Sequence, residues 1–168
     1  MRFCGVFRER FPTVSLRVHT ETLAAVSALV LDGTCLLGVV SPNAPRAGLV
    51  ARHATTVRMV TVVGATHPLA ACAREGRVPV AMLAPHVQIV LSERAMEGVS
   101  AVPDQAVLSA QTWRVADLSA KHAMLVAGLG WGNMPVHMVR EGLAAGALVR
   151  LRPEAWPDEG PSVALAAP

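Results

Sequence analysis

The stretch Trp113–Pro135, WRVADLSAKHAMLVAGLGWGNMP, constrains the fold more than any other part of the chain. It has the pattern of a strand, a helix, a glycine-rich turn and a short strand that ends at proline. The glycines, at 128, 130 and 132, come just past the apolar helix, where a left-handed residue satisfies the last helical carbonyls. This order excludes a dinucleotide-binding fingerprint, because that glycine motif follows a strand and opens a helix. The stretch therefore predicts a β-α-β unit, and we expect a ligand site there first.

A second unit of the same kind is predicted nearer the N-terminus. Val14–His19, VSLRVH, alternates between apolar and polar residues as a strand does. Thr20 then opens a helix that Asp32 and Gly33 close. The apolar run Leu36–Val40 is typical of a strand covered on both faces. Two such strands around one helix predict a parallel pair with a right-handed crossover.

Hydrophobic periodicity and proline or glycine boundaries predict the remaining elements. They are a helix that ends at Phe11, a short helical turn or loop over Val80–Pro85, a helix over Pro135–Ala145, and strands over Val57–Val63, His86–Leu91, Leu148–Leu151 and Ser162–Ala167. The residues from 92 to 106 are predicted to be a loop or a broken helix. The strand near Val57–Val63 and a return strand at Leu148–Leu151 would join two α/β lobes by a double crossover, with a small-ligand cleft between them.

Composition favours a water-soluble chain without a nucleic-acid surface of its own. Although 52% of the 168 residues are hydrophobic, no window of about 18 residues is free of charge and proline, so no membrane span is expected. The N-terminus has no secretory apolar core, which predicts a cytoplasmic protein. The net charge is +3, but the arginines are scattered and aromatic residues make up only 4%, whereas nucleic-acid surfaces have basic stripes or stacking platforms.

The sequence carries no motif of metal binding, cofactor binding or catalysis. The three cysteines are widely spaced and lack a CxxC pair, so neither a disulfide framework nor a zinc site is expected. The six histidines form no HExxH or HxH motif, and there is no GxSxG elbow or P-loop. We expect no catalytic residue, no metal and no cofactor, and hence a protein that is not an enzyme.

Several short motifs, in order, resemble the effector-binding domain of LysR-type transcriptional regulators. They are FRERFPTVSLRV followed by a helix, Asp32-Gly33 and an LGVV strand; His67-Pro68-Leu69-Ala70; LVAGLGWGNMP; and EGLAAGALVRL. The similarity extends from about Phe7 to Leu151. It implies a two-lobed, periplasmic-binding-protein-like (type II) α/β fold. The implied lobes are residues 1–63 with 153–168, and residues 64–152.

The chain departs from the family pattern in two ways. It has no helix-turn-helix or linker helix, so we expect it to contact DNA only through a helix-turn-helix domain that this chain lacks. The first strand of the effector domain and its last helix are also missing. The fold is therefore expected to be truncated at both ends.

The resemblance implies a small-molecule effector held between the lobes by helix N-termini, backbone amides and hydroxyl side chains. The matching positions in this chain are Thr20, Thr22, Ser92, Ser119, Lys121, Trp131 and Gly132. Each has a simpler alternative. Thr20 and Ser119 (or Asp117) would cap helices, Ser92 would be a loop residue, Lys121 a solvated surface residue and Trp131 a core residue.

By the same resemblance, the expected role is transcriptional regulation, in which an effector shifts the lobes and a homodimer transmits the change. The dimer would place the helix that ends at Phe11 against the partner's helix Pro135–Ala145. The alternatives are a free-standing solute-binding protein, an enzyme, and a truncated remnant without function.

Overall fold

The structure of the chain is a computed structural model that describes residues 2–21, 24–40, 47–73, 76–92, 106–156 and 162–167. The elements, in chain order, are α1 (Arg2–Arg10), α2 (Ala24–Leu31), β1 (Arg52–Gly64), α3 (Leu69–Cys72), α4 (Val80–Leu83), β2 (Gln88–Leu91), β3 (Thr112–Val115), α5 (Leu118–Val126), β4 (Trp131–Pro135), α6 (Val136–Ala144), β5 (Leu148–Leu151) and β6 (Ser162–Ala167). None of the described helices is long and apolar enough to cross a membrane.

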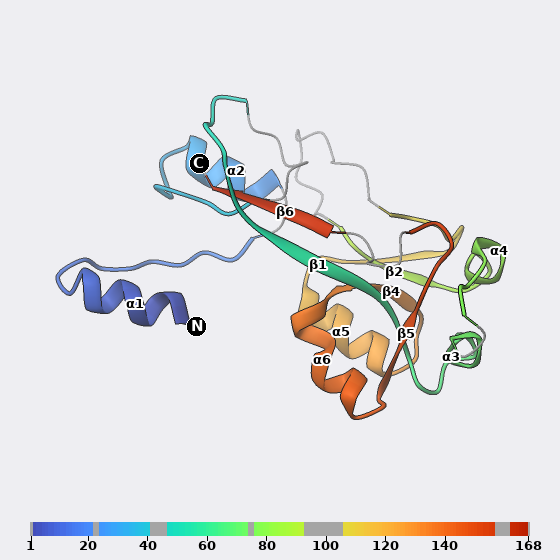
Figure 1. Cartoon of the computed structure of the whole chain (residues 1–168). Coiled ribbons are helices and arrows are strands. Elements are labelled where there is room, and N and C mark those ends of the chain that lie inside the picture. Colours follow the sequence, from blue (N-terminus) through green and yellow to red (C-terminus); the bar gives the residue numbers. More distant parts are fainter. Residues whose placement is uncertain are drawn as a thin grey trace.

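The strands form one mixed sheet of six strands, with the order β3-β2-β4-β1-β5 and with β6 paired to β1 (Figure 1). Strand β2 is parallel to both β3 and β4, whereas β1 is antiparallel to β4, β5 and β6. The predicted strand–helix–strand unit of the glycine-rich stretch is therefore present as β3-α5-β4. Its two strands are not neighbours, because β2 lies between them.

Strand β1 belongs to two pairings at once. Its second half, Thr61–Gly64, is hydrogen-bonded to β5, and Met59–Val63 to β4. Its first half, Arg52–Arg58, pairs with β6. The side chains of the first half are mostly exposed and those of the last five residues are buried. The strands predicted at Val57–Val63 and Leu148–Leu151 are both confirmed: Leu148–Leu151 is β5, which runs antiparallel beside the second half of β1, while β6 runs beside its first half.

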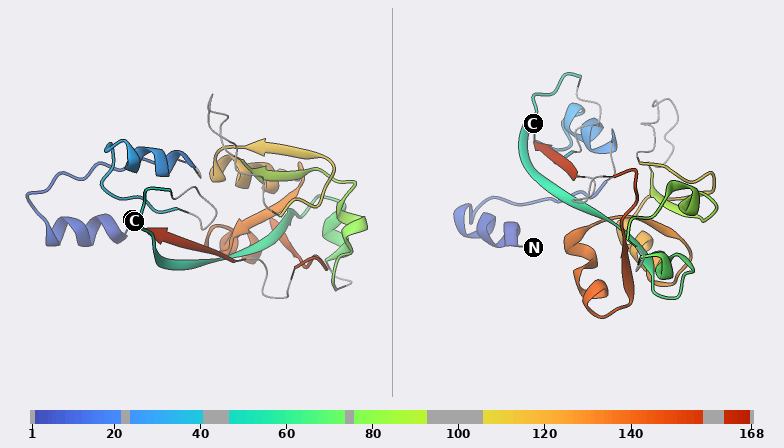
Figure 2. Two further views of the ribbon diagram at one scale, coloured as in Figure 1. Left: turned by 90° about the horizontal axis from the view of Figure 1, so that it is seen from above. Right: turned by 45° about the vertical axis from the view of Figure 1, so that its right-hand side comes forward.

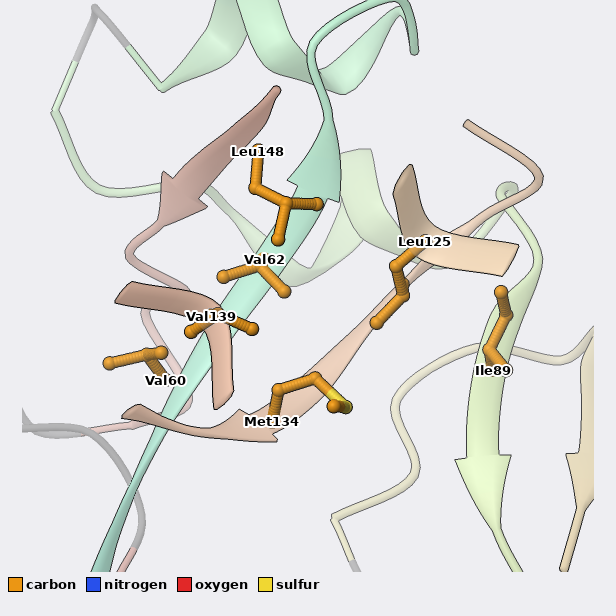
Figure 3. Close-up of a cluster of buried hydrophobic side chains, with 7 residues drawn as sticks. All are labelled: Val60, Val62, Ile89, Leu125, Met134, Val139 and Leu148. Carbon is orange, nitrogen blue, oxygen red and sulfur yellow. The ribbon is translucent and has the colours of Figure 1, made fainter. Parts of the chain in front are cut away.

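Helices cover both faces of the sheet. On one face, α5 and α6 bury Leu125 and Val139 against Val60, Val62 and other side chains of β1, β2 and β4 (Figure 3). On the other face, α3 and α4 pack over a second cluster. Its fully or almost fully buried members are Val63, Leu69, Val78, Leu83, Trp131 and Leu151. Alternate residues of β1 therefore serve opposite cores, as the two-residue period of a strand requires.

Helix α5 approaches β1 backbone to backbone at its C-terminal end. A Cβ atom on Gly64 would lie 2.5 Å from the carbonyl oxygen of Leu125 and 2.9 Å from the Cα of Gly128. Gly128 has a φ of +74°, and its N–H donates to the carbonyl of Leu125 at 3.0 Å. The predicted left-handed glycine after this helix is confirmed, and it lets α5 end directly against the strand.

The two strands predicted near the N-terminus are wrong. Val14–His19 has turn, bend or irregular structure, and Leu36–Val40 has only a single bridge residue, at Val40. Their apolar side chains are largely exposed, with 68% for Val18 and 98% for Leu36. A strand is held by the ladder it shares with a neighbour, and within the described residues neither segment has one. The predicted N-terminal β-α-β unit is therefore absent from the described part of the chain.

The helices of this N-terminal part do form. Helix α1 ends at Arg10, next to Phe11 and Pro12 as predicted, and lies at the opposite end of the molecule from α3 and α4 (Figure 2). Helix α2 ends at the predicted Asp32-Gly33 turn, where Gly33 has a φ of +79°. Glu21, the residue after Thr20, is not helical, so the prediction that Thr20 opens this helix is wrong.

The core of the N-terminal part is small. Its one described cluster has Val40 as the buried member, with Val26 and Ala51 packed against it. Burial of apolar surface is the main source of stability, so the described N-terminal part is stabilised by much less hydrophobic burial than the sheet and its helices.

We expect hydrogen exchange to separate the two parts. Amides of Val60–Val63 and of α5 should exchange on the order of 100-fold or more slowly than those of residues 15–20, because the former are hydrogen-bonded in a buried ladder or helix. Mass spectrometry of peptides after exchange would measure this. Equal protection of both segments would contradict the small N-terminal core.

Replacement of Gly64 by Ala should lower the free energy of unfolding by about 1–3 kcal/mol, because the added methyl group meets backbone atoms that cannot move aside cheaply. Urea unfolding followed by tryptophan fluorescence would measure it. Gly5→Ala is the control, because nothing lies within 4 Å of a Cβ at that position, and it should be neutral or slightly stabilising. Equal effects of the two changes would argue against the tight contact.

Candidate functional site

The candidate site lies where β2 and β3 end and α5 begins. Leu91 at the end of β2 is in register with Val115 at the end of β3, and the N–H of Ser92 donates to the carbonyl of Val115 at 2.9 Å. The chain then enters α5 within three residues. The carboxyl ends of parallel strands and the first turn of a helix meet at this edge, which is where open α/β sheets bind ligands.

Asp117 is the residue that caps α5. Its backbone is extended, and its Oδ1 accepts a hydrogen bond from the N–H of Ala120 at 2.7 Å. Of the two capping residues considered from the sequence, Asp117 is confirmed. Ser119 is exposed in the first turn, and its hydroxyl is not needed for the cap.

Lys121 lies on the sheet-facing side of α5. Leu118, Lys121 and Leu125 follow each other at intervals of three and four residues, the spacing of a buried helical stripe. Only 4% of Lys121 is exposed. The prediction of a solvated surface lysine, considered as an alternative, is therefore wrong.

Gly132 of β4 makes room for this lysine. A Cβ atom on Gly132 would lie 3.2 Å from the Cε and 3.6 Å from the Nζ of Lys121, and 2.6 Å from the carbonyl oxygen of Ile89. The lysine side chain thus passes between α5 and the sheet at the one position of β4 that has no side chain on this face. Of the predicted site residues, Ser92 and Ser119 lie where β2 and β3 end and α5 begins, whereas the side chain of Lys121 and Gly132 meet beside Ile89, nearer the start of β2.

Burial changes the acid–base behaviour of Lys121. The pKa of its amine falls from the ordinary 10.5 to about 8, because desolvation disfavours the charged form. A pKa near 8 still leaves the amine mostly protonated at pH 7, so the buried stripe of α5 carries a positive charge.

Trp131 serves the core on the opposite face of β4. Its side chain is fully buried among Val63, Leu69 and Leu83, and its Nε1–H donates to the carbonyl of Leu83 at 3.2 Å. Because neighbouring residues of a strand point to opposite faces, Trp131 and Gly132 cannot present side chains to one pocket. Of the two alternatives for Trp131, the structure has the indole in the core.

The two N-terminal threonines are not placed at this edge by any described interaction. Thr20 is exposed in an irregular segment before α2. Thr22 lies outside the described residues, as do residues 93–105, which include most of the predicted loop or broken helix. A contribution of Thr20 or Thr22 to a ligand site stays a prediction.

The sequence analysis missed two residues with buried polar atoms, one on β2 and one on α5. Gln88, at the start of β2, accepts hydrogen bonds at Oε1 from the N–H groups of Leu108 and Ser109, at 2.8 and 3.1 Å, and donates to the carbonyl of Ala106 at 2.7 Å. It thereby fixes the segment that leads into β3. His122 has a buried Nε2 with no hydrogen-bond partner in the described chain. No motif would have revealed either role.

The His-Pro-Leu-Ala motif has a structural role at the other face. Nδ1 of His67 accepts a hydrogen bond from the N–H of Leu69 at 3.1 Å, and the ring lies 5.0 Å from that of His86, centroid to centroid. Burial, and in second place the charge of His86, lower the pKa of His67. Among the described residues no group of three or more histidine, cysteine or acidic side chains is arranged to hold a metal.

A protein-family model described as the LysR substrate binding domain matches residues 1–168. A search of curated protein sequences finds no match.

Solved structures of LysR-family regulatory domains have the same fold. The MetR regulatory domain from N. meningitidis aligns with a TM-score of 0.66 and 18% identity, over 98% of this chain and 75% of that one. The Synechocystis PCC6803 CcmR regulatory domain in complex with 2-PG gives 0.73 and 15%, over 99% and 78%. A variant of the OxyR regulatory domain from Pseudomonas aeruginosa gives 0.69 and 16%, over 98% and 76%. At these identities the likeness concerns the fold, and the predicted periplasmic-binding-protein-like α/β class is confirmed.

Replacement of Lys121 by Met should raise the free energy of unfolding at pH 7 by about 3 kcal/mol, the energy that corresponds to a pKa lowered from 10.5 to about 8. At a pH between about 8 and 10.5, the unfolded chain still holds the lysine proton and the folded chain has lost it. The stability of the wild type therefore rises across that window relative to the variant.

Urea unfolding of both proteins at pH 7 and pH 10.5 measures this effect. The chain has no tyrosine, and every group that the two proteins share cancels in the difference. A stability difference that stays constant over this range would show that Lys121 is not desolvated in the folded state.

Proposed function

Since this chain belongs to the LysR substrate binding domain family, we propose that it senses a small-molecule effector for a LysR-type transcriptional regulator. The family is one of transcription-regulator domains and not of enzymes. DNA would be contacted through a helix-turn-helix domain that the 168 residues do not contain, and the protein would act in the cytoplasm, where its DNA lies.

One observation carries the proposal of a ligand at the carboxyl edge of the sheet. Lys121 is 4% exposed, and its side chain lies between α5 and Gly132, one helical turn from the start of α5. Buried charges in folded proteins are normally paired or bound to a ligand. The neighbouring hydroxyl groups of Ser92 and Ser119 would add neutral donors, and the CcmR domain of similar fold is a complex with 2-PG.

Movement of two lobes against each other is the proposed response to the ligand. The division proposed from the sequence is residues 1–63 with 153–168 against residues 64–152. The paired stretch of Arg52–Arg58 with β6 would connect the lobes. The side chains of β1 in this stretch are mostly exposed, so twisting this pair of strands costs less free energy than twisting a strand buried in a core.

A homodimer would transmit the change. The proposed contact is α1 of one chain against α6 of its partner. The apolar residues Val6 and Phe11 support it, because they are 56% and 46% exposed at or next to α1, and an exposed apolar helix face is what a partner would cover.

Two measurements on the purified chain test the proposed function. Light scattering at micromolar concentration should give the mass of a dimer. A thermal-shift screen of a small-molecule library should find compounds that raise the melting temperature, and small-angle scattering should then show a smaller radius of gyration with the compound bound. A monomeric mass would refute the dimer, and no stabilising compound from a broad library would count against effector binding.

Ser119→Ala is the variant that assigns the site. It should weaken binding of a compound found in the screen several-fold and leave the melting temperature of the free protein unchanged, because Asp117 and not Ser119 caps α5. Gln111→Ala is the matched control, since Gln111 is exposed at the other end of β3. Equal binding by both variants would place the ligand elsewhere.

A further inference from the structure

The chain has two stretches with the sequence order of strand, helix and strand, and only one of them has a strand in its middle. In β3-α5-β4, the outer strands are not neighbours, because β2 lies between them and is parallel to both. The N-terminal part has the same order of patterns, with Val14–His19 before α2 and Leu36–Val40 after it. The connections are of similar length, residues 116–130 in the first stretch and 20–35 in the second.

The segment after each helix packs on that helix at a glycine. A Cβ atom on Gly132 of β4 would lie 3.2 Å from the Cε of Lys121 in α5. A Cβ atom on Gly38, in the middle of the apolar segment after α2, would lie 2.6 Å from the Cγ1 of Val26 and 3.2 Å from the Cγ2 of Val30. Helix α2 and the segment after it are therefore packed together as α5 and β4 are, although that segment is not a strand.

In the complete stretch, the middle strand supplies apolar surface on which the helix packs. Ile89 of β2 and Leu125 of α5 are both fully buried in one cluster. Helix α2 is apolar along its length, AAVSALVL, and a helix that is apolar on all sides is normally buried. Among its described side chains, however, only Ser27 is buried, and Leu31 is 56% exposed. Within the described residues, α2 thus lacks the apolar surface that β2 gives to α5.

The segments on either side of α2 are exposed in the same way. Leu37 and Val39 are 63% and 51% exposed, and the apolar side chains of Val14–His19 are exposed as well. A continuous apolar run is typical of a strand that is covered on both faces. Adjacent exposed apolar residues on a folded chain mark a surface that binds a partner.

We propose that the N-terminal part accepts an extended apolar strand of another polypeptide, which pairs in parallel between Val14–His19 and Leu36–Val40. Every strand of the described chain already belongs to the six-stranded sheet, so none of them is left for this position. The alignment with the MetR domain covers 98% of this chain but 75% of that one. Domains of this fold therefore contain more chain than these 168 residues supply. The proposal does not depend on effector binding.

Strand β2 indicates the chemistry of the partner strand. Its sequence, QIVL, is uncharged, and three of its four side chains are buried. The partner strand should likewise be uncharged and rich in β-branched residues, because α2 would cover one of its faces. When a strand adds to a sheet, main-chain hydrogen bonds give the affinity and alternate side chains give the specificity.

A peptide with the sequence of residues 86–92, which contain β2, is the probe, with lysines added at both ends for solubility. Added to the full chain, it should slow amide exchange in residues 15–19 and 36–40 by about tenfold or more, because a ladder forms there. Mass spectrometry of peptic fragments measures this. The same peptide with Ile89→Pro is the control and should have no effect, because proline cannot donate to a ladder.

The variant Leu36→Asp separates acceptance of a strand from folding of the free chain. Because 98% of Leu36 is exposed, the change should leave the melting temperature of the free chain unchanged. It should abolish the protection by the peptide, since a carboxylate would be buried beside the added strand. Met82→Asp, at an exposed apolar residue of α4, is the matched control and should leave the protection intact.

Four results would overturn the proposal. The first two are no protection of either segment by the unmodified peptide, and equal protection by the proline peptide. Protection confined to β3 would show that the peptide adds to the edge of the main sheet instead. Protection that rises with the concentration of the chain alone would mean that a second copy fills the position and not a separate partner strand.

Discussion

Backbone pairing of β1 along both of its edges is the interaction on which the rest of the structure depends. Val62 and Val63 are hydrogen-bonded partners of β4 and of β5 at the same time, and their side chains enter the two cores on opposite faces. The same strand then continues outward to pair with β6. Both cores, the anchoring of α5 and the connection to the N-terminal part therefore depend on one strand that is held in place by several neighbours.

The elements around β1 could be predicted from the sequence because each carries its own boundary signals. Asp117 and Gly128 delimit α5, and Gly146 ends α6 with a φ of +71°. The N-terminal strands could not be predicted correctly. The apolar alternation in Val14–His19 is compatible with a strand, but it does not show that a partner strand is present. Whether a ladder forms depends on a neighbouring strand, which is a property of the fold and not of the segment. The order of strands, with β2 inserted between β3 and β4, has no local signal either.

The start of α5 could be predicted as the place of several candidate side chains from its position after a strand, and their binding of a ligand stays a prediction. The structure has Ser92 and Ser119 where β2 and β3 end, whereas Lys121 and Gly132 meet beside Ile89. The burial of Lys121 was not predicted, although the sequence spacing indicates it. Lys121 follows Leu118 by three residues and precedes Leu125 by four, so all three lie on the same helical stripe. Trp131 was expected at the site from the family resemblance, with a core role as the alternative, and strand alternation directs its indole into the core on the opposite face.

The contact between Gly64 and the end of α5 gives that helix two unequal ends. At the C-terminal end, the carbonyl oxygen of Leu125 and the Cα of Gly128 lie so close to Gly64 that even a Cβ atom would not fit between them, so the helix cannot shift there. At the N-terminal end, the flexible side chain of Lys121 separates it from β4. Helix α5 has nine residues and is about 13 Å long. It is thus held by a close backbone contact at its C-terminal end, and near its N-terminal end it contacts β4 through a flexible side chain. Any displacement of its free end must appear as a tilt about β1, the strand that leads out of the sheet.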